Sequence, residues 1–469
     1  MNAQLIDART DAHLWADTFD GDTGDIFALQ ASLAQKIAAA LKATLTPGER
    51  TLIERRPTQN QEAYELYVRA RAMQQELGEV GAPADYERII TVYEQAIAKD
   101  PSFALAHVQA SLVHVIMYWF AFLDPTPARA ERAKASLDAA VRLAPDLPET
   151  RLALGAYYYR VHRDWSRALA EFRAAESGLP NDAQLFFWLA VTHRRLGKWT
   201  EAIGYFERTI ALNPHNLASV GNYTGFLTEV RRWEQARATA ERFLAYFPAN
   251  RDLLTAEADA RFALGGDRMA YAGVIATLPP RAVDAGGLGD KYRAELLKGD
   301  YVAADRILAN PRLDALPEPI NNVITDPVDF HRAFVAFVRG NREASRRLAE
   351  KAVTYYRAGP WNARQQPWVQ MRIAMAAAWS GRAEEALRDG RAALTEELAQ
   401  DAYDAAHLRS FLGIIYLSLD RRDDAVACLR EILSGPCAMS PNEIRIAPLW
   451  SRLKDDPRFE EILKAAKPL

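Results

Sequence analysis

The sequence predicts an all-α protein built from stacked helical hairpins, and three observations predict it. Alanine supplies 84 of the 469 residues, while Gly and Pro number only 24 each, and this composition favours helix throughout. Small, aromatic and proline positions recur every 34 residues, as Pro180, Pro214 and Pro248 show. A fixed period of this length is typical of repeat arrays, in which each unit buries its apolar face against the next unit.

Charge and cysteine content exclude several classes of protein. Lys and Arg total 58 and Asp and Glu total 61, so the net charge is -3, without the basic excess of a protein that coats nucleic acid. Two cysteines, Cys428 and Cys437, are too few for a disulfide scaffold. They are expected to be free thiols in a reducing compartment, with pairing to each other as the alternative.

The sequence favours a protein without a membrane span. The first residues lack the basic start and apolar run of a signal peptide. Residues 104–123 lack Asp, Glu, Lys and Arg, but they include His107, Gln109, Ser111 and His114, so they predict a buried helix. The expected compartment is the cytoplasm; the periplasm is the alternative if the complete protein carries an upstream membrane helix.

Three consecutive repeats carry the strongest pattern. Their matching residues are Leu154-Gly155, Tyr158, Ala168, Phe172 and Pro180; then Leu189, Gly197-Lys198-Trp199, Ala202, Phe206 and Pro214; then Trp233, Ala236 and Pro248. The first of these units has one extra residue in its turn, near His162. This pattern resembles the tetratricopeptide repeat, whose small residues let two antiparallel helices approach and whose proline ends the second helix.

Weaker copies extend the array on both sides to about nine or ten hairpins. Degraded turn signatures recur at Gly265-Gly266, Gly299, Gly340, Gly381 and Asp420. Proline-rich stretches at residues 278–289 and 310–327 interrupt the pattern. They either divide the array into two arms or are longer turns, and the sequence leaves both readings open.

The first sixty residues differ from the array. Residues 4–8 and 13–19 have strand character, and residues 25–45 form an amphipathic helix. This segment resembles the second half of a TolB-amino-terminal-like (FlgO-like) domain, which precedes tetratricopeptide arrays in bacterial signalling proteins. The first half of that domain is missing, so we expect a truncated product or an internal start codon. The free strand edge would allow self-association.

The sequence divides into five segments. Residues 1–56 are the partial α+β segment, 57–61 a linker, 62–277 the N-terminal arm, 278–439 a degenerate C-terminal arm and 440–469 a cap. No nucleotide-binding, metalloprotease or Cys-x-x-Cys motif occurs. We therefore predict no catalytic residues, no cofactor and no metal, and the chain is expected not to be an enzyme.

The resemblance implies a concave groove lined by the first helix of each hairpin. In the strong repeats, the residues expected to face it are Leu152, Tyr159, Gln184, Phe187, Arg194 and Thr228. Phe187 and Tyr159 would hold an apolar side chain, and Arg194 a carboxylate. The alternative is that Phe187 packs between repeats and Arg194 is merely solvated.

These observations predict a scaffold that binds a protein or peptide in the groove. The alternative is a sensory or regulatory module of a larger bacterial signalling protein, a nucleotide cyclase or a transcription regulator. An unrecognised enzyme would need a cluster of acids or His with perturbed pKa values in one cleft, which only a structure reveals.

Overall fold

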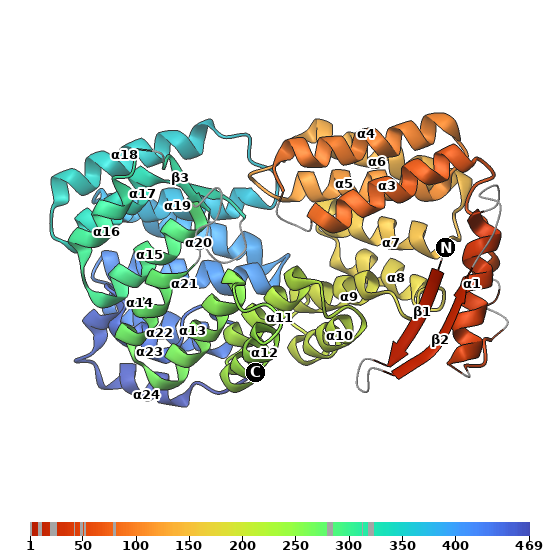
Figure 1. Ribbon diagram of the computed structural model, residues 1–469. Helices are drawn as coiled ribbons and strands as arrows, with labels where there is room; N and C mark the ends of the chain where they lie inside the picture. The colour runs from red at the N-terminus through yellow and green to blue at the C-terminus, as the bar shows by residue number, and fades with distance from the viewer. Residues whose placement is uncertain are drawn as a thin grey trace.

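The computed structural model describes residues 2–7, 12–18, 26–41, 43–46, 50, 53–77, 81–278, 285–311, 313–317 and 323–469. Helices dominate these residues, and the predicted all-α class is confirmed (Figure 1). The described strands form two separate two-stranded antiparallel sheets. Among the described residues, no helix has both the length and the apolar character needed to cross a bilayer.

Ten helical hairpins follow one another in the part of the chain that the structure describes. The six hairpins of residues 61–277 are α3 (Gln61–Leu77) and α4 (Pro83–Lys99), α5 (Ala104–Trp119) and α6 (Pro127–Leu143), α7 (Pro148–Tyr157) and α8 (Trp165–Ala175), α9 (Ala183–Arg195) and α10 (Trp199–Leu212), α11 (Leu217–Glu229) and α12 (Trp233–Leu244), α13 (Arg251–Gly265) and α14 (Arg268–Thr277). The remaining four are α15 (Ala285–Lys298) and α16 (Tyr301–Leu308), α17 (Val328–Val338) and α18 (Arg342–Ala358), α19 (Gln365–Trp379) and α20 (Ala383–Leu398), α21 (Ala402–Ser418) and α22 (Arg422–Ser434). Short elements α23 (Pro441–Ile446), η2 (Trp450–Leu453) and α24 (Pro457–Ala465) close the chain.

Close packing within a hairpin requires the small residues that the repeat pattern singled out. A Cβ atom placed on Gly155 of α7 would lie 2.4 Å from the ring of Phe172 on α8, so only glycine fits there without a shift. Ala202 and Phe206 on α10 are fully buried. The helices end before the prolines that recur every 34 residues. For example, α10 ends at Leu212 and Pro214 follows in the turn.

Left-handed residues mark the turn between the two helices of a hairpin. Gly197, Gly266, Gly299, Gly340 and Gly381 have φ between 72° and 82°. Three turns place another residue in this conformation, Arg163, Arg231 and Asp420. A left-handed backbone costs a residue with a Cβ atom about 1–2 kcal/mol, so these three positions need a compensating contact.

The N-terminal segment forms two strands and a helix, as the sequence predicts. Strand β1 (Asn2–Asp7) pairs antiparallel with β2 (Ala12–Thr18), and Leu5 lies opposite Trp15. Helix α1 (Ile26–Ala40) lies beside β2, and the Lys36 Nζ–Asp17 Oδ2 distance is 2.6 Å. Residues 8–11, between the two strands, lie outside the described residues.

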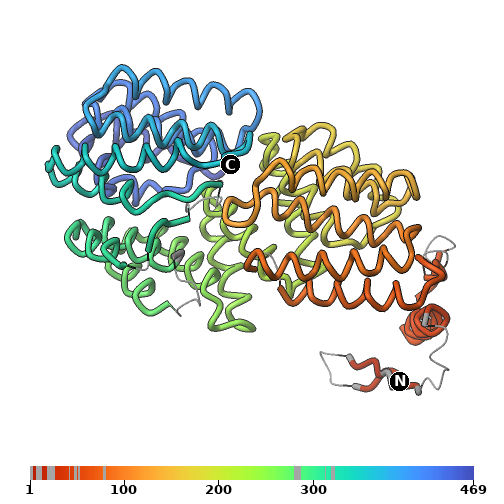
Figure 2. The backbone as a smooth tube through the Cα atoms, turned by 90° about the horizontal axis from the view of Figure 1, so that it is seen from above, coloured from red at the N-terminus to blue at the C-terminus, as the bar shows by residue number. Residues whose placement is uncertain are grey.

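The array turns back on itself. We use "N-terminal arm" for α3–α14 and "C-terminal arm" for α15–α24. In Figure 2 the green repeats connect the two sides, and the blue repeats return beside the yellow ones. Within the second proline-rich stretch, β3 (Ala315–Pro317) pairs antiparallel with β4 (Thr325–Pro327). The predicted division at residue 277 stays a prediction, but sequence-distant helices α9 and α21 are in contact.

Candidate functional site

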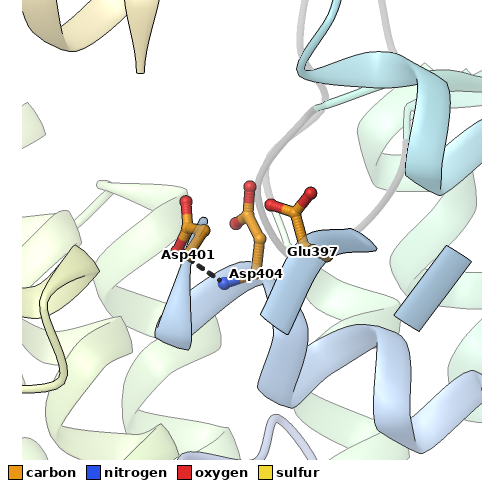
Figure 3. Close-up of side chains that lie close together, drawn as sticks. All are labelled: Glu397, Asp401 and Asp404. Carbon is orange, nitrogen blue, oxygen red and sulfur yellow. Dashed lines mark hydrogen bonds between the residues drawn. The ribbon is translucent and has the colours of Figure 1, made fainter. Parts of the chain in front are cut away.

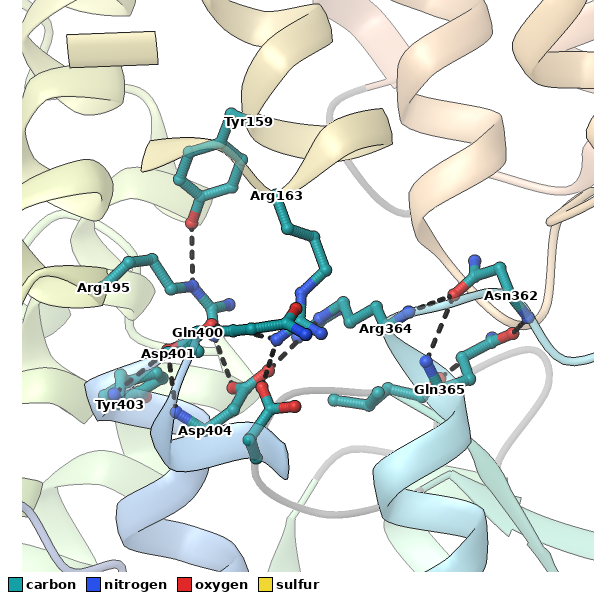
Figure 4. Close-up of polar contacts among 12 residues, drawn as sticks. Tyr159, Arg163, Arg195, Asn362, Arg364, Gln365, Gln400, Asp401, Tyr403 and Asp404 are labelled. Atoms are coloured by element: carbon teal, nitrogen blue, oxygen red, sulfur yellow. Dashed lines mark hydrogen bonds and ion pairs between the residues drawn. The ribbon is translucent and has the colours of Figure 1, made fainter. Parts of the chain in front are cut away.

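The most unusual site in the described residues is the junction where the two arms meet. It lies between the turn-side ends of α7 and α9 and the connection from α20 to α21 (Figure 4). Arginines face carboxylates there, with both sets buried. Buried charges are costly unless they are paired and hydrogen-bonded, so the geometry of each pair decides what the cluster can do.

The three carboxylates come from one short stretch of the C-terminal arm. Glu397 lies in the last turn of α20, and the chain reverses at Gln400. Asp401 caps the N-terminus of α21 by accepting hydrogen bonds from the backbone nitrogens of Tyr403 and Asp404, each 3.0 Å long. Figure 3 shows the three side chains rising side by side from this connection.

Arg195, at the end of α9, holds both aspartates. Its Nη1 atom lies 2.9 Å from Asp401 Oδ2 and 2.5 Å from Asp404 Oδ1. Its Nε atom donates to the hydroxyl of Tyr159 at 3.0 Å, which fixes the plane of the guanidinium. A guanidinium that donates in three directions has little freedom to rotate, so the two aspartates are bound in one geometry.

Arg163 reaches the cluster because of the extra residue in its turn. The insertion predicted near His162 is accommodated by η1 (Tyr158–His162), a π-helical turn that extends α7. Arg163 follows it with φ 55°, and its Nη2 atom donates to Glu397 and lies 3.8 Å from Asp401 Oδ2. The hydrogen bond to Glu397 is the contact that compensates for the left-handed backbone.

A third arginine and aromatic rings complete the cluster. Arg364, just before α19, places Nε 3.4 Å from Asp404 Oδ2 and stacks its guanidinium 3.9 Å from the ring centre of Trp119. Trp165 donates its indole N–H to the carbonyl oxygen of Gln400 at 2.6 Å. The rings shield the charges from water, which strengthens each electrostatic interaction.

Burial and pairing move the pKa values in opposite directions. Burial raises the pKa of Glu397 to about 8, with Arg163 opposing the rise and the neighbouring carboxylates adding to it. Burial likewise raises the pKa of Asp401 against the pull of Arg195. For Asp404, Arg195 and Arg364 together outweigh burial and hold its pKa below the usual range. Burial lowers the pKa of Arg364 to about 10.

The same carboxylates satisfy the distance requirement of a metal site. Oxygen atoms of Glu397, Asp401 and Asp404 lie within 4.8 Å of one another. Each carboxylate, however, is paired with an arginine of the cluster. A divalent cation would have to displace fixed guanidinium groups that already neutralise these oxygens. The arrangement therefore favours an ion-pair network over a metal centre.

Further contacts join the arms beside the cluster. The backbone nitrogen of Cys437 donates to the Glu229 oxygen at 3.0 Å, and Arg231, the second arginine with a left-handed backbone, donates to the carbonyl oxygens of Gly435 and Lys467. On α23, Asn442 donates to the Ala263 oxygen at 2.9 Å. The turn edge of the N-terminal arm is therefore held along several repeats.

The structure divides the six predicted groove residues into two groups. Leu152, Tyr159 and Arg194 are buried, with 3%, 3% and 6% of their surface exposed. Leu152 packs in the apolar core, whereas Tyr159 and Arg194 belong to the junction. Gln184, Phe187 and Thr228 are half-buried. Whether any of the six contacts a partner stays a prediction.

Sequence reasoning missed Arg163, Arg195, Arg364 and the three carboxylates. Two signals pointed to them. Arg163 and Arg231 stand at turn positions where other repeats have glycine. Asp404 lies within a helix whose residues are almost all buried, and a carboxylate in such a helix needs a partner from elsewhere. Neither signal names the partner, which lies about 200 residues away along the chain.

The comparison with protein families identifies the repeats. Residues 183–216, which contain α9 and α10, match the tetratricopeptide repeat. A putative adenylate cyclase 3 from Rhizobium meliloti (strain 1021) is 30% identical over 171 residues. The match covers 36% of this chain, and the chain spans only 28% of the length of that relative.

Three solved structures show partial similarity to this chain. PilF of Pseudomonas aeruginosa is 16% identical with a TM-score of 0.35, over 45% of this chain and 90% of that one. A tetratricopeptide repeat protein from Parabacteroides merdae ATCC 43184 is 14% identical with a TM-score of 0.40, over 58% of this chain and 98% of that one. YrrB, described as having an unusual peptide-binding site, is 16% identical with a TM-score of 0.30, over 46% and 96% of the two chains.

Proposed function

Because the chain is a tetratricopeptide-repeat protein, a fold that serves as an interaction scaffold and is typically non-catalytic, we propose that it binds a peptide or protein segment on its N-terminal arm. The binding surface is the part of the predicted groove that the C-terminal arm leaves open, formed by Gln184 and Phe187 on α9 and Thr228 on α11. No bond is made or broken in this function.

The observation that carries the proposal is the half-buried ring of Phe187. It lies 6.1 Å from the ring of Phe206 and 6.2 Å from that of Trp188, so its inner side is fixed by aromatic packing. Its outer side stays accessible. A ring that its aromatic neighbours hold in place and that stays partly exposed loses little conformational entropy on binding and suits an apolar side chain of a peptide.

A peptide selection tests this proposal. Peptides selected from a random library on the full chain are expected to lose affinity about tenfold or more with Phe187→Ala, since each 1.4 kcal/mol of binding energy is a factor of ten. Leu212→Ala is the matched control, because Leu212 is an exposed apolar residue of the same repeat on α10. Equal losses from both variants, or no loss from Phe187→Ala, would refute the groove.

The similarity to a putative adenylate cyclase favours a second candidate function. In this case the repeats are a sensory or regulatory module of a larger signalling protein, a nucleotide cyclase or a transcription regulator. An immunoblot of source cells with an antibody against the repeats measures the size of the natural polypeptide. A band clearly larger than this 469-residue chain supports the regulatory module, whereas a band of the same size as this chain supports a protein that acts by itself.

A further inference from the structure

We propose that the turn edge of the N-terminal arm is a docking site for an acidic helix that carries a tyrosine, and that α21 occupies this site within the same chain. We call the site the arginine–aromatic face and define it by Arg163, Arg194, Arg195, Tyr159 and Trp165. It is distinct from the groove at Phe187, and neither proposal depends on the other.

The first argument is the distribution of charge. At the cluster, the ion pairs between the arms run from arginines of the N-terminal arm to carboxylates of the C-terminal arm: Arg163 to Glu397 and Asp401, and Arg195 to Asp401 and Asp404. In the closed chain these guanidinium groups are buried, so an occupant that covered the face without supplying carboxylates would leave them buried and unpaired. That costs several kcal/mol, so the face requires an acidic occupant.

The second argument is the way Tyr403 sits between the aspartates. Its ring centre lies 4.3 Å from the guanidinium carbon of Arg194 and 5.2 Å from that of Arg195, and its ring is 6.2 Å from the ring of Phe226. Asp401 and Asp404 are three residues apart at the start of α21, so both carboxylates face the same side. The occupant is therefore recognised by two carboxylates with an aromatic ring between them.

The third argument concerns selectivity. Apolar residues of similar volume would hold two arms together at least as well as buried ion pairs do. Charges add a requirement that apolar contacts lack, because an occupant without matching carboxylates leaves the arginines unpaired and is rejected. A partner helix with the same acidic and tyrosine pattern could therefore displace α21 from the junction, whereas helices without this pattern could not.

The test uses the full chain and a fluorescent peptide that spans residues 396–411. In the Asp401→Asn, Asp404→Asn variant, α21 loses the carboxylates opposite Arg195. This variant is expected to bind the peptide at least about tenfold more tightly than the unchanged chain, in which tethered α21 competes at an effective concentration near the millimolar range. A peptide with Asn at both aspartate positions should not bind. Equal affinity of the two proteins, or of the two peptides, overturns the proposal.

An engineered disulfide keeps the test decisive if that variant does not fold. A Cβ atom built on Gly197 would lie 3.4 Å from the Cβ of Ala402, close to the separation in a disulfide. Because Gly197 has φ 72°, cysteine there costs about 1–2 kcal/mol, and this cost is the same in both redox states that the test compares. In the Gly197→Cys, Ala402→Cys variant, oxidation should abolish peptide binding, and reduction should restore it to the weaker level of the unchanged chain. Binding that is equal in both states overturns the proposal.

Phe187→Ala separates the two proposed sites. This variant should bind the acidic peptide with unchanged affinity, whereas groove peptides should bind equally to the oxidised and reduced disulfide variant. If Phe187→Ala abolished binding of the acidic peptide, the peptide would be binding in the groove, and the proposed docking face would be overturned. Failure of the groove peptides alone would leave the arginine–aromatic face standing.

Discussion

The hairpin α9–α10 and the junction between the arms are both buried, yet different chemistry holds each of them. Between the two helices of the hairpin, the apolar side chains of Ala190, Ala202 and Phe206 exclude water. At the junction, Arg195 and Asp404 are equally well buried and carry opposite charges. The contacts of the hairpin join residues that are close in the sequence, whereas the junction joins residues about 200 positions apart and depends on every partner being present.

Removing one charge from the junction gives the largest expected effect. Asp404→Ala leaves Arg195 and Arg364 buried without their shared carboxylate and should lower the free energy of unfolding by about 3–5 kcal/mol. The control is Asp423→Ala, which breaks the ion pair of an 89% exposed side chain with Arg458 and should cost less than about 1 kcal/mol. Urea titration followed by circular dichroism measures both. Equal effects would mean that the cluster is solvated rather than buried.

A crowded glycine in another hairpin, α7–α8, gives the next largest expected effect. Gly155→Ala forces a methyl group against Phe172 and should lower the free energy of unfolding by about 1–3 kcal/mol. Gly204 on α10 has open space around its missing Cβ, so Gly204→Ala should stabilise the helix by up to about 1 kcal/mol. Thermal denaturation compares the two. The same sign for both variants would contradict close packing at Gly155.

The pH dependence of stability tests the buried carboxyl group of Glu397 at the junction. Burial raises the pKa of Glu397 to about 8. Between its unfolded pKa near 4.5 and this folded value, the native state keeps a proton that the unfolded chain has lost. The free energy of unfolding should therefore fall as pH rises from about 5 to 8, by at most about 1.4 kcal/mol per pH unit for this group.

Glu397→Gln should flatten that part of the profile, because glutamine does not titrate. Urea titrations of both proteins at several pH values measure the difference. Asp401 contributes with the same sign, since burial raises its pKa as well, so some slope remains in the variant. A profile of the variant that parallels the unchanged chain would show that Glu397 ionises normally and that Arg163 outweighs burial.

The contrast between hairpin and junction also explains how much the sequence predicts. Pro180, Pro214, Phe172 and Phe206 recur in phase because each hairpin repeats the same local packing. Composition, this spacing and the resemblance to the tetratricopeptide repeat therefore predicted the fold class and the approximate number of hairpins. The junction has no period. Arg195 and Asp401 are 206 residues apart, and their pairing depends on how the array turns. The predicted groove residue Arg194 lies beside the arginine that binds the carboxylates, one position away on α9.

Substitutions in the N-terminal β-hairpin, formed by β1 and β2, have the smallest expected effect on stability. The described side chains of Ile6 and Leu14 are 43% and 50% exposed, and β1 pairs only with β2 among the described strands. We propose that two copies of the chain associate through this edge, since an unpaired strand edge is a template for another strand.

Ile6→Lys and Leu14→Lys should change the free energy of unfolding by less than about 0.5 kcal/mol but should shift the chain toward the monomer. Light scattering after size-exclusion chromatography measures the mass, with Met269→Lys as the control for an exposed apolar residue far from the strands. A mass that does not depend on Ile6 and Leu14 would mean that any association uses another surface.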